Sequence, residues 1–547
     1  MNSSPSFKPQ LIREPVLADL ALHSVEGDKT MCAGCSRKFL KGLVPLIGLI
    51  FVFALSATIA WSKDLPCSFK LTILYMNDTH GHYSPEADRD GQISGGFAKA
   101  MTVMEKIRKA NETEGRITIT LLAGDLFTGT AYSAVFKGRL GVRLMDAMDF
   151  SAMAVGNHEF DYGLPNLLKR LKPDMKFPLL SANIHYKNGS LVFKPYVIKK
   201  LPNKKCKILI LGLTTMSTPE LTHPKNVKGL VFEDPVKAAC KIVEKEGENK
   251  FVIALTHLGV DKDKKLGLLC PGIDVIIGGH SHTSLFEPLK LDGTLVCQAG
   301  AYSKYVGRLD LDVKNGRIED YKGELIKLDA NVPEDLQVGS MIGKYNDKMS
   351  PYFGEVVGSS EVDLDGGLAS VRSFSPCPLG TLVAYAMAHA VGADAGLING
   401  GGIRDGLKAG SISNRDIYGM LPFQNLIMKI SMKGADLESV LRHSKDLPKR
   451  SGGKLQTYGI QYKTSGNELL ITQVGKKSFN PDEYYSIAIS DFLYSGGDGY
   501  TEFAARAKAV SPDGLPLNQV FSRFIREKKE ITKGLLESLK NPPKDKN

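Results

Sequence analysis

The stretch of this chain with the most evident chemistry is Gly156-Asn157-His158-Glu159-Phe160-Asp161, which follows the short apolar run 151–155. It places an amide, an imidazole and two carboxylates directly after a predicted buried strand. Polar groups at that position lie at the carboxyl end of the strand, where open α/β sheets carry their sites. Alone, the motif also fits an ordinary turn that contains asparagine. It predicts a functional site only if other segments place similar groups beside it.

Four further strand-like runs end in the same kind of residue. Because the carboxyl ends of parallel strands meet at one edge of a sheet, we expect these polar groups to lie close together. Asp78 and His80 are two residues apart, so they point the same way from an extended segment. The runs and the residues that follow them are 69–76 before Asn77-Asp78-Thr79-His80, 117–123 before Gly124-Asp125, 251–255 before Thr256-His257, and 273–277 before Gly278-Gly279-His280-Ser281-His282.

Carboxylate, imidazole and amide groups without thiolates suit divalent ions such as zinc, manganese, cobalt or iron. Asp125 could bridge two ions. Two metal ions about 3.5–4 Å apart clamp a phosphate and lower the pKa of a bridging water, so that hydroxide is placed for in-line attack on phosphorus. The sequence contains no Gly-x-Ser-x-Gly nucleophile motif and no P-loop. We therefore predict metal-dependent phosphoester hydrolysis without a protein nucleophile.

The elements that must position these groups follow an α/β pattern. Between 69 and 328, short β-branched runs alternate with helical stretches, which predicts a domain at 66–329 with largely parallel strands. Pro333-Glu334-Asp335 is typical of a helix start, and 330–353 is predicted to be a helix that joins two domains. A second unit at 354–547 mixes helices and strands. Rotation about the joining helix is expected to load and release substrate. The other predicted elements are helices at 103–110, 140–148, 380–391 and 434–443 and strands at 177–184, 206–213, 459–464 and 484–490.

Composition is that of an ordinary globular protein. The 547 residues include 43% hydrophobic and 24% charged residues, and the length suggests two or more domains. The formal net charge of +11 is spread along the chain. It is compatible with an anionic substrate and does not imply nucleic-acid binding.

The N-terminal region predicts export. A polar tail at 1–41 precedes the uncharged run 42–61, which is long enough to span a bilayer, and Arg37, Lys38 and Lys41 lie on its N-terminal side. We favour a signal anchor that holds the protein to the membrane with its catalytic part outside the cytoplasm. A cleaved signal peptide, which would leave a secreted or periplasmic protein, is the alternative. Six cysteines follow this run, where oxidation is permitted, and their pairing cannot be deduced.

The ordered set Asp78-x-His80, Gly124-Asp125, Gly156-Asn157-His158-Glu159, His257 and Gly279-His280-x-His282 resembles the calcineurin-like metallophosphoesterases and, within them, the 5′-nucleotidase family. The resemblance implies an αββα sandwich followed by a C-terminal α+β nucleotide-binding domain. It implies two divalent ions, such as zinc or manganese, and a dyad of His158 and Asp161 that stabilises the transition state and assists the leaving oxygen. The implied ligands are Asp78, His80, Asp125 and His282 for one ion and Asp125, Asn157, His257 and His280 for the other.

The second unit is expected to determine the substrate specificity. The glycine run 400–402, before Arg404, lets backbone amides approach an anion closely. Leu421-Pro422-Phe423 and the segment 491–499 are similar to the family's nucleoside-binding segments. The resemblance implies that Phe423 and Phe492 sandwich the base. It also places Asn399, Gly401, Arg404, Gly459 and Asp498 around the base and ribose.

The chain departs from the family at one position. Ser373 stands where the family usually has an arginine, and Arg372, one residue earlier, is the candidate to replace it. His82 follows Gly81 in the same loop as His80 and could support the ligands, but the resemblance gives it no ligand role, so we interpret it as an ordinary residue. Four other histidines lie in no cluster with ligand spacing and are interpreted as ordinary surface or core residues; they are His185, His223, His389 and His443.

The most specific prediction is that the protein hydrolyses nucleoside 5′-monophosphates outside the cytoplasm. UDP-sugar hydrolysis or 2′,3′-cyclic-nucleotide hydrolysis would use the same metal centre. An inactive surface protein that keeps the fold for binding is the non-enzymatic alternative. The sequence leaves the physiological metal, the preferred base and the oligomeric state open.

Overall fold

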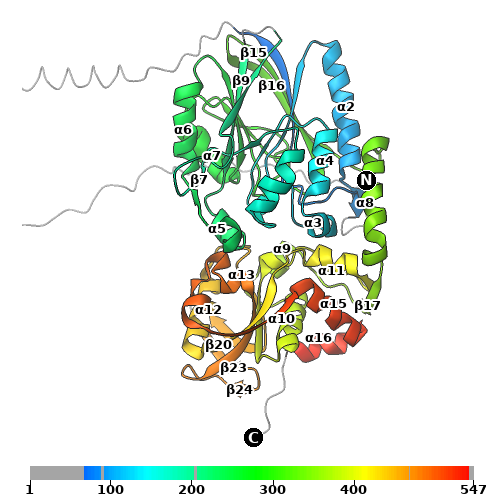
Figure 1. Ribbon diagram of the computed structural model, residues 1–547, viewed down its shortest axis with the longest axis vertical. Coiled ribbons are helices and arrows are strands. Elements are labelled where there is room, and N and C mark those ends of the chain that lie inside the picture. Colours follow the sequence, from blue (N-terminus) through cyan, green and yellow to red (C-terminus); the bar gives the residue numbers. More distant parts are fainter. Residues whose placement is uncertain (1–66, 88–91, 203–205, 467, 541–547) are drawn as a thin grey trace, which may run out of the picture. The chain divides into compact units, whose positions relative to one another are not determined.

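The computed structural model describes residues 67–87, 92–202, 206–466 and 468–540, which form a first domain of two packed sheets followed by a second, smaller domain (Figure 1). The tail at 1–41 and the apolar run 42–61 lie outside the described residues. Among the helices that are described, none is both long and apolar enough to cross a bilayer.

The first domain is built on two six-stranded sheets. In the first sheet, in the order β16-β15-β1-β4-β5-β6, the four strands β1, β4, β5 and β6 are parallel to one another. β15 pairs with β1 in the antiparallel sense, and β16 pairs with β15 in the antiparallel sense. Its strands are β1 (Phe69–Met76), β4 (Ile117–Leu122), β5 (Ala152–Ala154), β6 (Leu179–Leu180), β15 (Tyr305–Lys314) and β16 (Arg317–Lys327).

The second sheet has four parallel central strands and an antiparallel strand at each edge. Its order is β13-β14-β12-β11-β9-β8, with β14, β12, β11 and β9 parallel. Its strands are β8 (Tyr196–Lys200), β9 (Lys207–Thr214), β11 (Phe251–His257), β12 (Val275–Ile277), β13 (Leu289–Leu291) and β14 (Thr294–Cys297).

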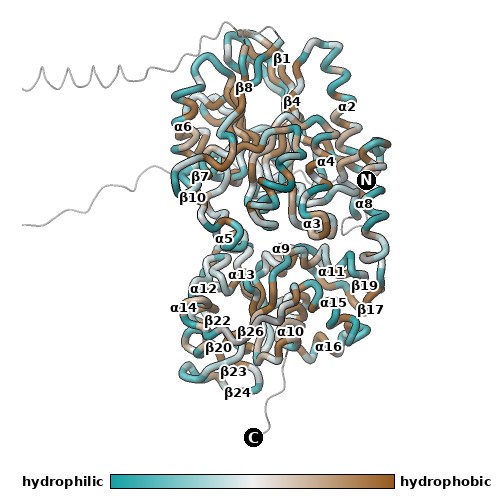
Figure 2. The backbone as a smooth tube through the Cα atoms, in the orientation of Figure 1, coloured by the Kyte–Doolittle hydropathy of each residue, from teal (hydrophilic) through white to brown (hydrophobic). Residues whose placement is uncertain are grey.

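The two sheets face each other across one apolar core, to which Ile73 of β1 and Ile253 of β11 both belong. Helices α2 (Phe97–Thr113), α3 (Ala131–Phe136) and α4 (Arg139–Ala147) cover the outer face of the first sheet, and α6 (Pro235–Glu246) and α7 (Val260–Leu269) cover the second. In Figure 2 the apolar segments gather on the strands between these helix layers. Because both faces of each sheet are covered, the central strands are mostly apolar. The predicted αββα sandwich is confirmed.

One predicted strand is divided. The stretch expected as a strand at 177–184 forms β6 and then, after a break, β7 (Ile184–Tyr186), which pairs with β10 (Leu230–Phe232). The break occurs at Asn183, whose side chain bonds to the backbone of Thr214 in the second sheet. Its amide nitrogen donates to the Thr214 carbonyl, and its amide oxygen accepts the Thr214 N–H. The chain therefore leaves the first sheet at this point and contacts the end of β9.

Helix α8 (Leu336–Phe353) follows the sandwich. It begins where the Asp335 carboxylate accepts the N–H of Val338 at 2.8 Å, which satisfies one of the unpaired donors of the first turn. Its buried side chains, among them Val338, Ile342 and Tyr345, belong to the same apolar core as α2 and α4. The segment predicted as a joining helix is therefore packed into the helix layer of the first domain.

The second domain has a five-stranded sheet in the order β21-β18-β25-β20-β26, with α10 (Pro378–Val391) and α15 (Leu517–Lys528) packed together in one core and α12 (Gly434–Asp446) in another. A three-stranded sheet, β19-β17-β27, and a second one, β22-β23-β24, complete it. The strands are β17 (Val356–Ser360), β18 (Ala395–Asn399), β19 (Gly410–Ser413), β20 (Leu426–Lys433), β21 (Leu455–Tyr458), β22 (Ile460–Ser465), β23 (Glu468–Val474), β24 (Lys477–Ser478), β25 (Tyr484–Ser490), β26 (Lys508–Pro516) and β27 (Glu530–Ile531).

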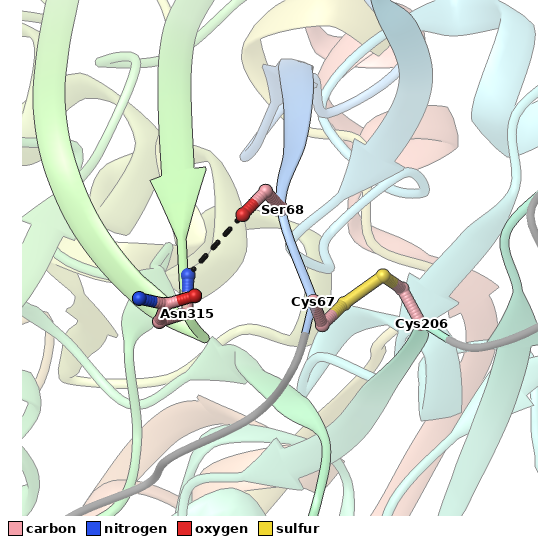
Figure 3. The surroundings of a disulfide bond; sticks show 4 residues. All are labelled: Cys67, Ser68, Cys206 and Asn315. Atoms are coloured by element: carbon pink, nitrogen blue, oxygen red, sulfur yellow. Dashed lines mark hydrogen bonds between the residues drawn. A yellow bond between two sulfur atoms is a disulfide. The ribbon is translucent and has the colours of Figure 1, made fainter.

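A disulfide bond joins Cys67, just before β1, to Cys206, just before β9, and so ties the two sheets of the sandwich together (Figure 3). Next to it, the N–H of Asn315 donates to Ser68 Oγ at 3.4 Å. Cys240, Cys270, Cys297 and Cys377 are not disulfide-bonded. The two paired cysteines are 139 residues apart, so the bond closes a long loop.

We expect the Cys67→Ala/Cys206→Ala double variant to lose about 2–5 kcal/mol of unfolding free energy, because a cross-link over so long a loop strongly restricts the unfolded chain. Thermal unfolding of the wild type and the variant under oxidising conditions measures the loss. The difference should vanish when a reductant is added to both proteins. Equal unfolding temperatures under oxidising conditions would contradict the assignment.

Candidate active site

The carboxyl ends of strands from both sheets bring the predicted polar residues together. Asp78 and His80 follow β1, Asp125 follows β4, and Asn157 and His158 follow β5; from the second sheet, His257 ends β11, while His280 and His282 follow β12. Five of these residues have positive φ values, between 49° and 80°; they are Asp78, His80, Asp125, His280 and His282. Left-handed backbone at residues other than glycine is strained and concentrates at functional sites.

Imidazole and carboxylate atoms within 4.8 Å of one another form three overlapping groups. The first contains Asp78, His80 and His282, and the third contains Asp125, His257 and His280. The second joins His80 and Asp125 to His158. Asp125 is shared by the second and third groups, as expected of a bridging ligand. Among the described residues, Asn157 Oδ1 is buried without a hydrogen-bond partner, which leaves it available to a cation.

Backbone carbonyls orient two of the imidazoles. His80 Nδ1 donates to the carbonyl of Thr128 at 2.9 Å, and His257 Nδ1 donates to that of Ala123 at 2.8 Å, so each ring turns its Nε2 toward the cluster. His80 Nε2 lies 3.0 Å from His282 Nε2, and His257 Nε2 lies 3.0 Å from Asp125 Oδ2 without hydrogen-bond geometry. Ring nitrogens and carboxylate oxygens that converge in this way fit a bound cation.

The charge states of three of the imidazoles also fit a metal. Burial, together with Arg404, lowers the pKa of His80 and of His282, and burial with His257 lowers that of His280 to about 3, so these three rings are neutral, as metal ligation requires. His257 differs: burial would lower its pKa, but Asp125 and Asp78 outweigh burial and raise it to about 10, so a metal ion would have to displace a proton from this ring. Burial raises the pKa of Asp78 to about 7, and the nearby Asp125 adds to the shift. Buried carboxylates that repel each other are stabilised by a shared cation.

Glu159 is a functional residue that the sequence interpretation did not assign. Its side chain is fully buried, and its Oε2 accepts the N–H of Gly156 at 2.7 Å and that of Asp125 at 2.9 Å. Its Oε1 accepts the N–H of Leu126 at 2.9 Å and that of Phe127 at 3.3 Å. Burial and the charge of Asp125 raise the pKa of Glu159 to about 7. Glu159 therefore fixes the left-handed turn that presents Asp125, and its place directly after Asn157-His158 was the available signal.

His158 and Asp161 form the predicted pair. The 3₁₀ turn η1 (His158–Phe160) brings His158 Nδ1 to 2.6 Å from Asp161 Oδ2. Burial alone would lower the pKa of His158, but Asp161 and Asp125 outweigh it and raise that pKa above its ordinary value. The ring of His158 lies 5.1 Å from that of His80 and 6.0 Å from that of Phe423, measured between centroids. The imidazole thus lies between the metal-binding cluster and the second domain.

A cavity of about 670 Å³ opens over this cluster and is lined by predicted site residues of both domains. Asn399 Nδ2 donates to Asp498 Oδ2 at 2.7 Å in its wall. Asp78, His80 and His257 are fully buried and do not line it. Residues 221–223 and 225–226 of the first domain also line it. The predicted site residues in the lining are, from the first domain, Asp125, Asn157, His158, Asp161, His280 and His282, and from the second, Arg372, Asn399, Gly401, Arg404, Phe423, Phe492 and Asp498.

Arg372 is present in this wall although it stands one residue away from the family's usual position. It follows the short helix α9 (Leu368–Val371), and its Nε is buried without a hydrogen-bond partner among the described residues. Burial and the positive charge of Arg404 lower the pKa of Arg372 to about 10. Two guanidinium groups that repel each other at a cavity wall favour an anion between them.

Gly459 does not reach this cavity, which corrects its expected role. It connects β21 to β22 with φ of +75°, and a Cβ at this position would lie 2.4 Å from the carbonyl oxygen of Asp394. The glycine is needed for a tight backbone crossing, and it lines a separate cavity of about 220 Å³ beside Cys377 and Leu536. Gly452 lines the large cavity instead, and its carbonyl accepts the N–H of Gly401 at 2.7 Å.

The remaining histidines have ordinary partners, with one exception. His82 contacts Glu86 at 2.7 Å, His185 contacts Glu233 at 3.1 Å, and His389 contacts Glu527 at 3.3 Å. His443 packs against the ring of Tyr500. The exception is His223, whose Nε2 lies 3.2 Å from Asp491 Oδ2 of the second domain.

We expect Glu159→Gln to weaken metal binding by about 10- to 100-fold, as for other residues that support ligands, because the amide nitrogen would face backbone N–H donors and loosen the turn that presents Asp125. Isothermal titration with manganese or zinc measures the affinity. Glu287→Gln, at an exposed position, is the matched control. Unchanged affinity in Glu159→Gln would show that the four hydrogen bonds do not position the ligand.

Comparison with known proteins agrees with this geometry. Residues 71–284 match the family model for calcineurin-like phosphoesterases, and residues 356–505 match that for the 5′-nucleotidase C-terminal domain. The chain is 32% identical to the 5′-nucleotidase of Homo sapiens over 79% of this chain and 84% of that protein. It is 30% identical to the 5′-nucleotidase of Vibrio cholerae over 80% of this chain and 87% of that protein.

Among solved structures, the 5′-nucleotidase precursor of Thermus thermophilus is similar, with a TM-score of 0.75 and 28% identity over 85% of this chain and 97% of that chain. The fold, the clustered His and Asp residues and these relatives agree with one another. The chain therefore belongs to the 5′-nucleotidase family and is a 5′-nucleotidase-type hydrolase, in which a calcineurin-like phosphoesterase domain precedes a C-terminal 5′-nucleotidase domain.

Proposed function

We propose that this protein hydrolyses nucleoside 5′-monophosphates to nucleoside and phosphate outside the cytoplasm. The observation that carries the proposal is the single cavity that exposes the His158–Asp161 pair, the cation-binding cluster and two phenylalanines of the second domain. A phosphate over the cluster and a base between the rings would both be reached from this cavity.

The proposed ligands are Asp78, His80, Asp125 and His282 for one divalent ion and Asp125, Asn157, His257 and His280 for the other. When bound, the two ions would polarise the attacking water and offset the charge of the phosphate. The chain itself supplies the orientation of these groups: Glu159 holds the turn of Asp125, and Asn77 Nδ2 donates to Asp78 Oδ2 at 2.6 Å.

His158 is proposed to protonate the leaving 5′ oxygen. Its Nδ1 is engaged by Asp161, so Nε2 is the nitrogen left to donate, and the raised pKa of the ring keeps the proton available near neutral pH. Asp161 holds the ring in one tautomer and one orientation. The cationic ring also offsets negative charge that develops on the oxygen.

The second domain is proposed to bind the nucleoside. Phe423 and Phe492 would stack on the two faces of the base, an interaction that accepts many bases. Asn399 and Asp498 would contact the ribose beside Gly401, and the guanidinium groups of Arg404 and Arg372 would contact the anion. The Cys67–Cys206 disulfide supports export, because such bonds persist in oxidising compartments. The run 42–61 would provide the signal anchor or signal peptide.

Phosphate release from AMP, UDP-glucose and 2′,3′-cyclic AMP by the purified protein with manganese or zinc tests the proposal. AMP is expected to turn over fastest, and His158→Ala is expected to reduce this turnover by about 100- to 10,000-fold, the usual contribution of a positioned acid. His82→Ala is the matched control, because the imidazole of His82 contacts Glu86. Faster turnover of UDP-glucose or the cyclic diester would replace the proposed substrate, and turnover of none of the three would favour a binding protein.

The KM for AMP is expected to depend on Asp498. Burial raises the pKa of Asp498 to about 6, so the carboxylate gains a proton as the pH falls through about 6 and loses an acceptor for the ribose hydroxyls. The KM of the wild type should rise about fourfold between pH 7 and pH 5.5 relative to that of Asp498→Asn, which has no carboxylate to titrate. The phosphate of AMP titrates equally in both proteins. Parallel KM profiles would remove Asp498 from the binding site.

A further inference from the structure

A short segment of the first domain, Thr222 to Asn226, contacts both the His158–Asp161 pair and the second domain. It follows α5 (Thr218–Leu221) and enters the 3₁₀ turn η4 (Pro224–Val227), on the side of the first domain where α5 and α13 (Asp491–Tyr494) lie next to each other in Figure 1. Neither the metal cluster nor the expected nucleoside contacts include it.

Two side chains of the segment hold Asp161. Thr222 Oγ1 donates to Asp161 Oδ1 at 2.8 Å, and Asn226 Nδ2 donates to the backbone carbonyl of Asp161 at 2.9 Å. The other carboxylate oxygen of Asp161 is the one that contacts His158 Nδ1 at 2.6 Å. Thr222 is fully buried, so its hydroxyl is fixed in place. The direction in which Asp161 presents its carboxylate to His158 therefore depends on where this segment lies.

The next side chain contacts the second domain. His223 Nδ1 accepts the N–H of Lys225 at 3.3 Å, so the imidazole proton is on Nε2, which donates to Asp491 Oδ2 at 3.2 Å. Lys225 Nζ lies 3.5 Å from the same oxygen but is mostly exposed, so it adds little. The contact requires no charge on His223, because the neutral ring with its proton on Nε2 suffices.

Asp491 joins the two aromatic segments of the cavity. Its Oδ1 accepts the N–H of Leu426 at 3.0 Å, three residues after Phe423, and Phe492 is its neighbour in the chain. Phe423 and Phe492 both line the large cavity. A base that orders these rings would therefore also order the carboxylate that His223 contacts.

We propose that Thr222, His223 and Asn226 are positioning residues that couple occupation of the nucleoside site to the orientation of the His158–Asp161 pair. This inference rests on the proposed function. With a nucleoside bound, Asp491 holds His223, the segment is fixed, and Thr222 and Asn226 hold Asp161 so that His158 faces the leaving oxygen. A phosphate ester that has no nucleoside does not benefit from this contact.

The test compares kcat for AMP with kcat for p-nitrophenyl phosphate, which offers the phosphate without a base. His223→Phe keeps a ring and removes the donor; it should lower kcat for AMP by about three- to tenfold, the value of one hydrogen bond, while kcat for p-nitrophenyl phosphate changes by less than about twofold. His223→Gln, whose amide can still donate to Asp491, should restore most of the AMP activity. A rise in KM alone would mean that His223 only joins the domains, which would overturn the inference.

Thr222→Val removes the hydroxyl at nearly constant volume and should lower kcat for both substrates, whereas Thr222→Ser should restore it. The double variant His223→Phe/Thr222→Val should lose no more AMP activity than Thr222→Val alone, because His223 acts through the segment. Losses that multiply, or an equal loss on both substrates in His223→Phe, would overturn the inference.

The failure of the proposed function gives a different result. It would show in the wild type, as fast turnover of p-nitrophenyl phosphate and slow turnover of AMP. If the cyclic nucleotide is then the better substrate, the same comparison is made with it, because the coupling concerns the base and not the ester. If the wild type does not prefer any nucleotide to p-nitrophenyl phosphate, both proposals are wrong.

Discussion

The active site depends on one buried carboxylate that accepts four backbone hydrogen bonds. Glu159 holds the N–H groups of Gly156, Asp125, Leu126 and Phe127 and so joins the loops that follow β4 and β5. Asp125 has a left-handed backbone that a residue other than glycine adopts only under constraint. A buried charged acceptor shared by several N–H donors supplies such a constraint, since leaving those donors unpaired would be costly.

Hydrogen bonds with the backbone also position other residues of the cluster. Backbone carbonyls at Thr128 and Ala123 fix the tautomers of His80 and His257, and the N–H of His280 approaches both oxygens of Asp78 at 3.0 and 2.9 Å. The groups that would bind metal are thus held by the backbone of neighbouring strand ends, and two packed sheets keep those ends in place. Loop residues held directly at the ends of rigid strands are positioned more accurately than those of long free loops, which suits a centre in which small displacements change reactivity.

The second domain completes the cavity that opens over the cluster. His223 and Asp491 meet beside the cavity, and Asp491 in turn connects the chain near Phe423 to Phe492. The ring of His158, the histidine of the His158–Asp161 pair, lies near the ring of Phe423. The proposed recognition of the base and the proposed transfer of the proton would therefore fall to different domains, and a short segment of chain lies between them. Such a division allows a substrate to influence the chemistry through its distant end.

The sequence by itself determined the strand ends, the metal-ligand types and the family, because apolar runs followed by Asp, His and Asn at fixed spacing are local patterns that need no partner. β1 occupies the predicted 69–76, whereas the predicted strand 177–184 divides, since Asn183 bonds to Thr214, which is distant in sequence. Only the tertiary structure showed that Glu159 holds the turn of Asp125, and that Arg372 reaches the cavity whereas Gly459 does not. It also showed that Cys67 pairs with Cys206 and that His223 contacts Asp491. Each of these depends on which distant segments pack together, and packing is decided by the whole chain.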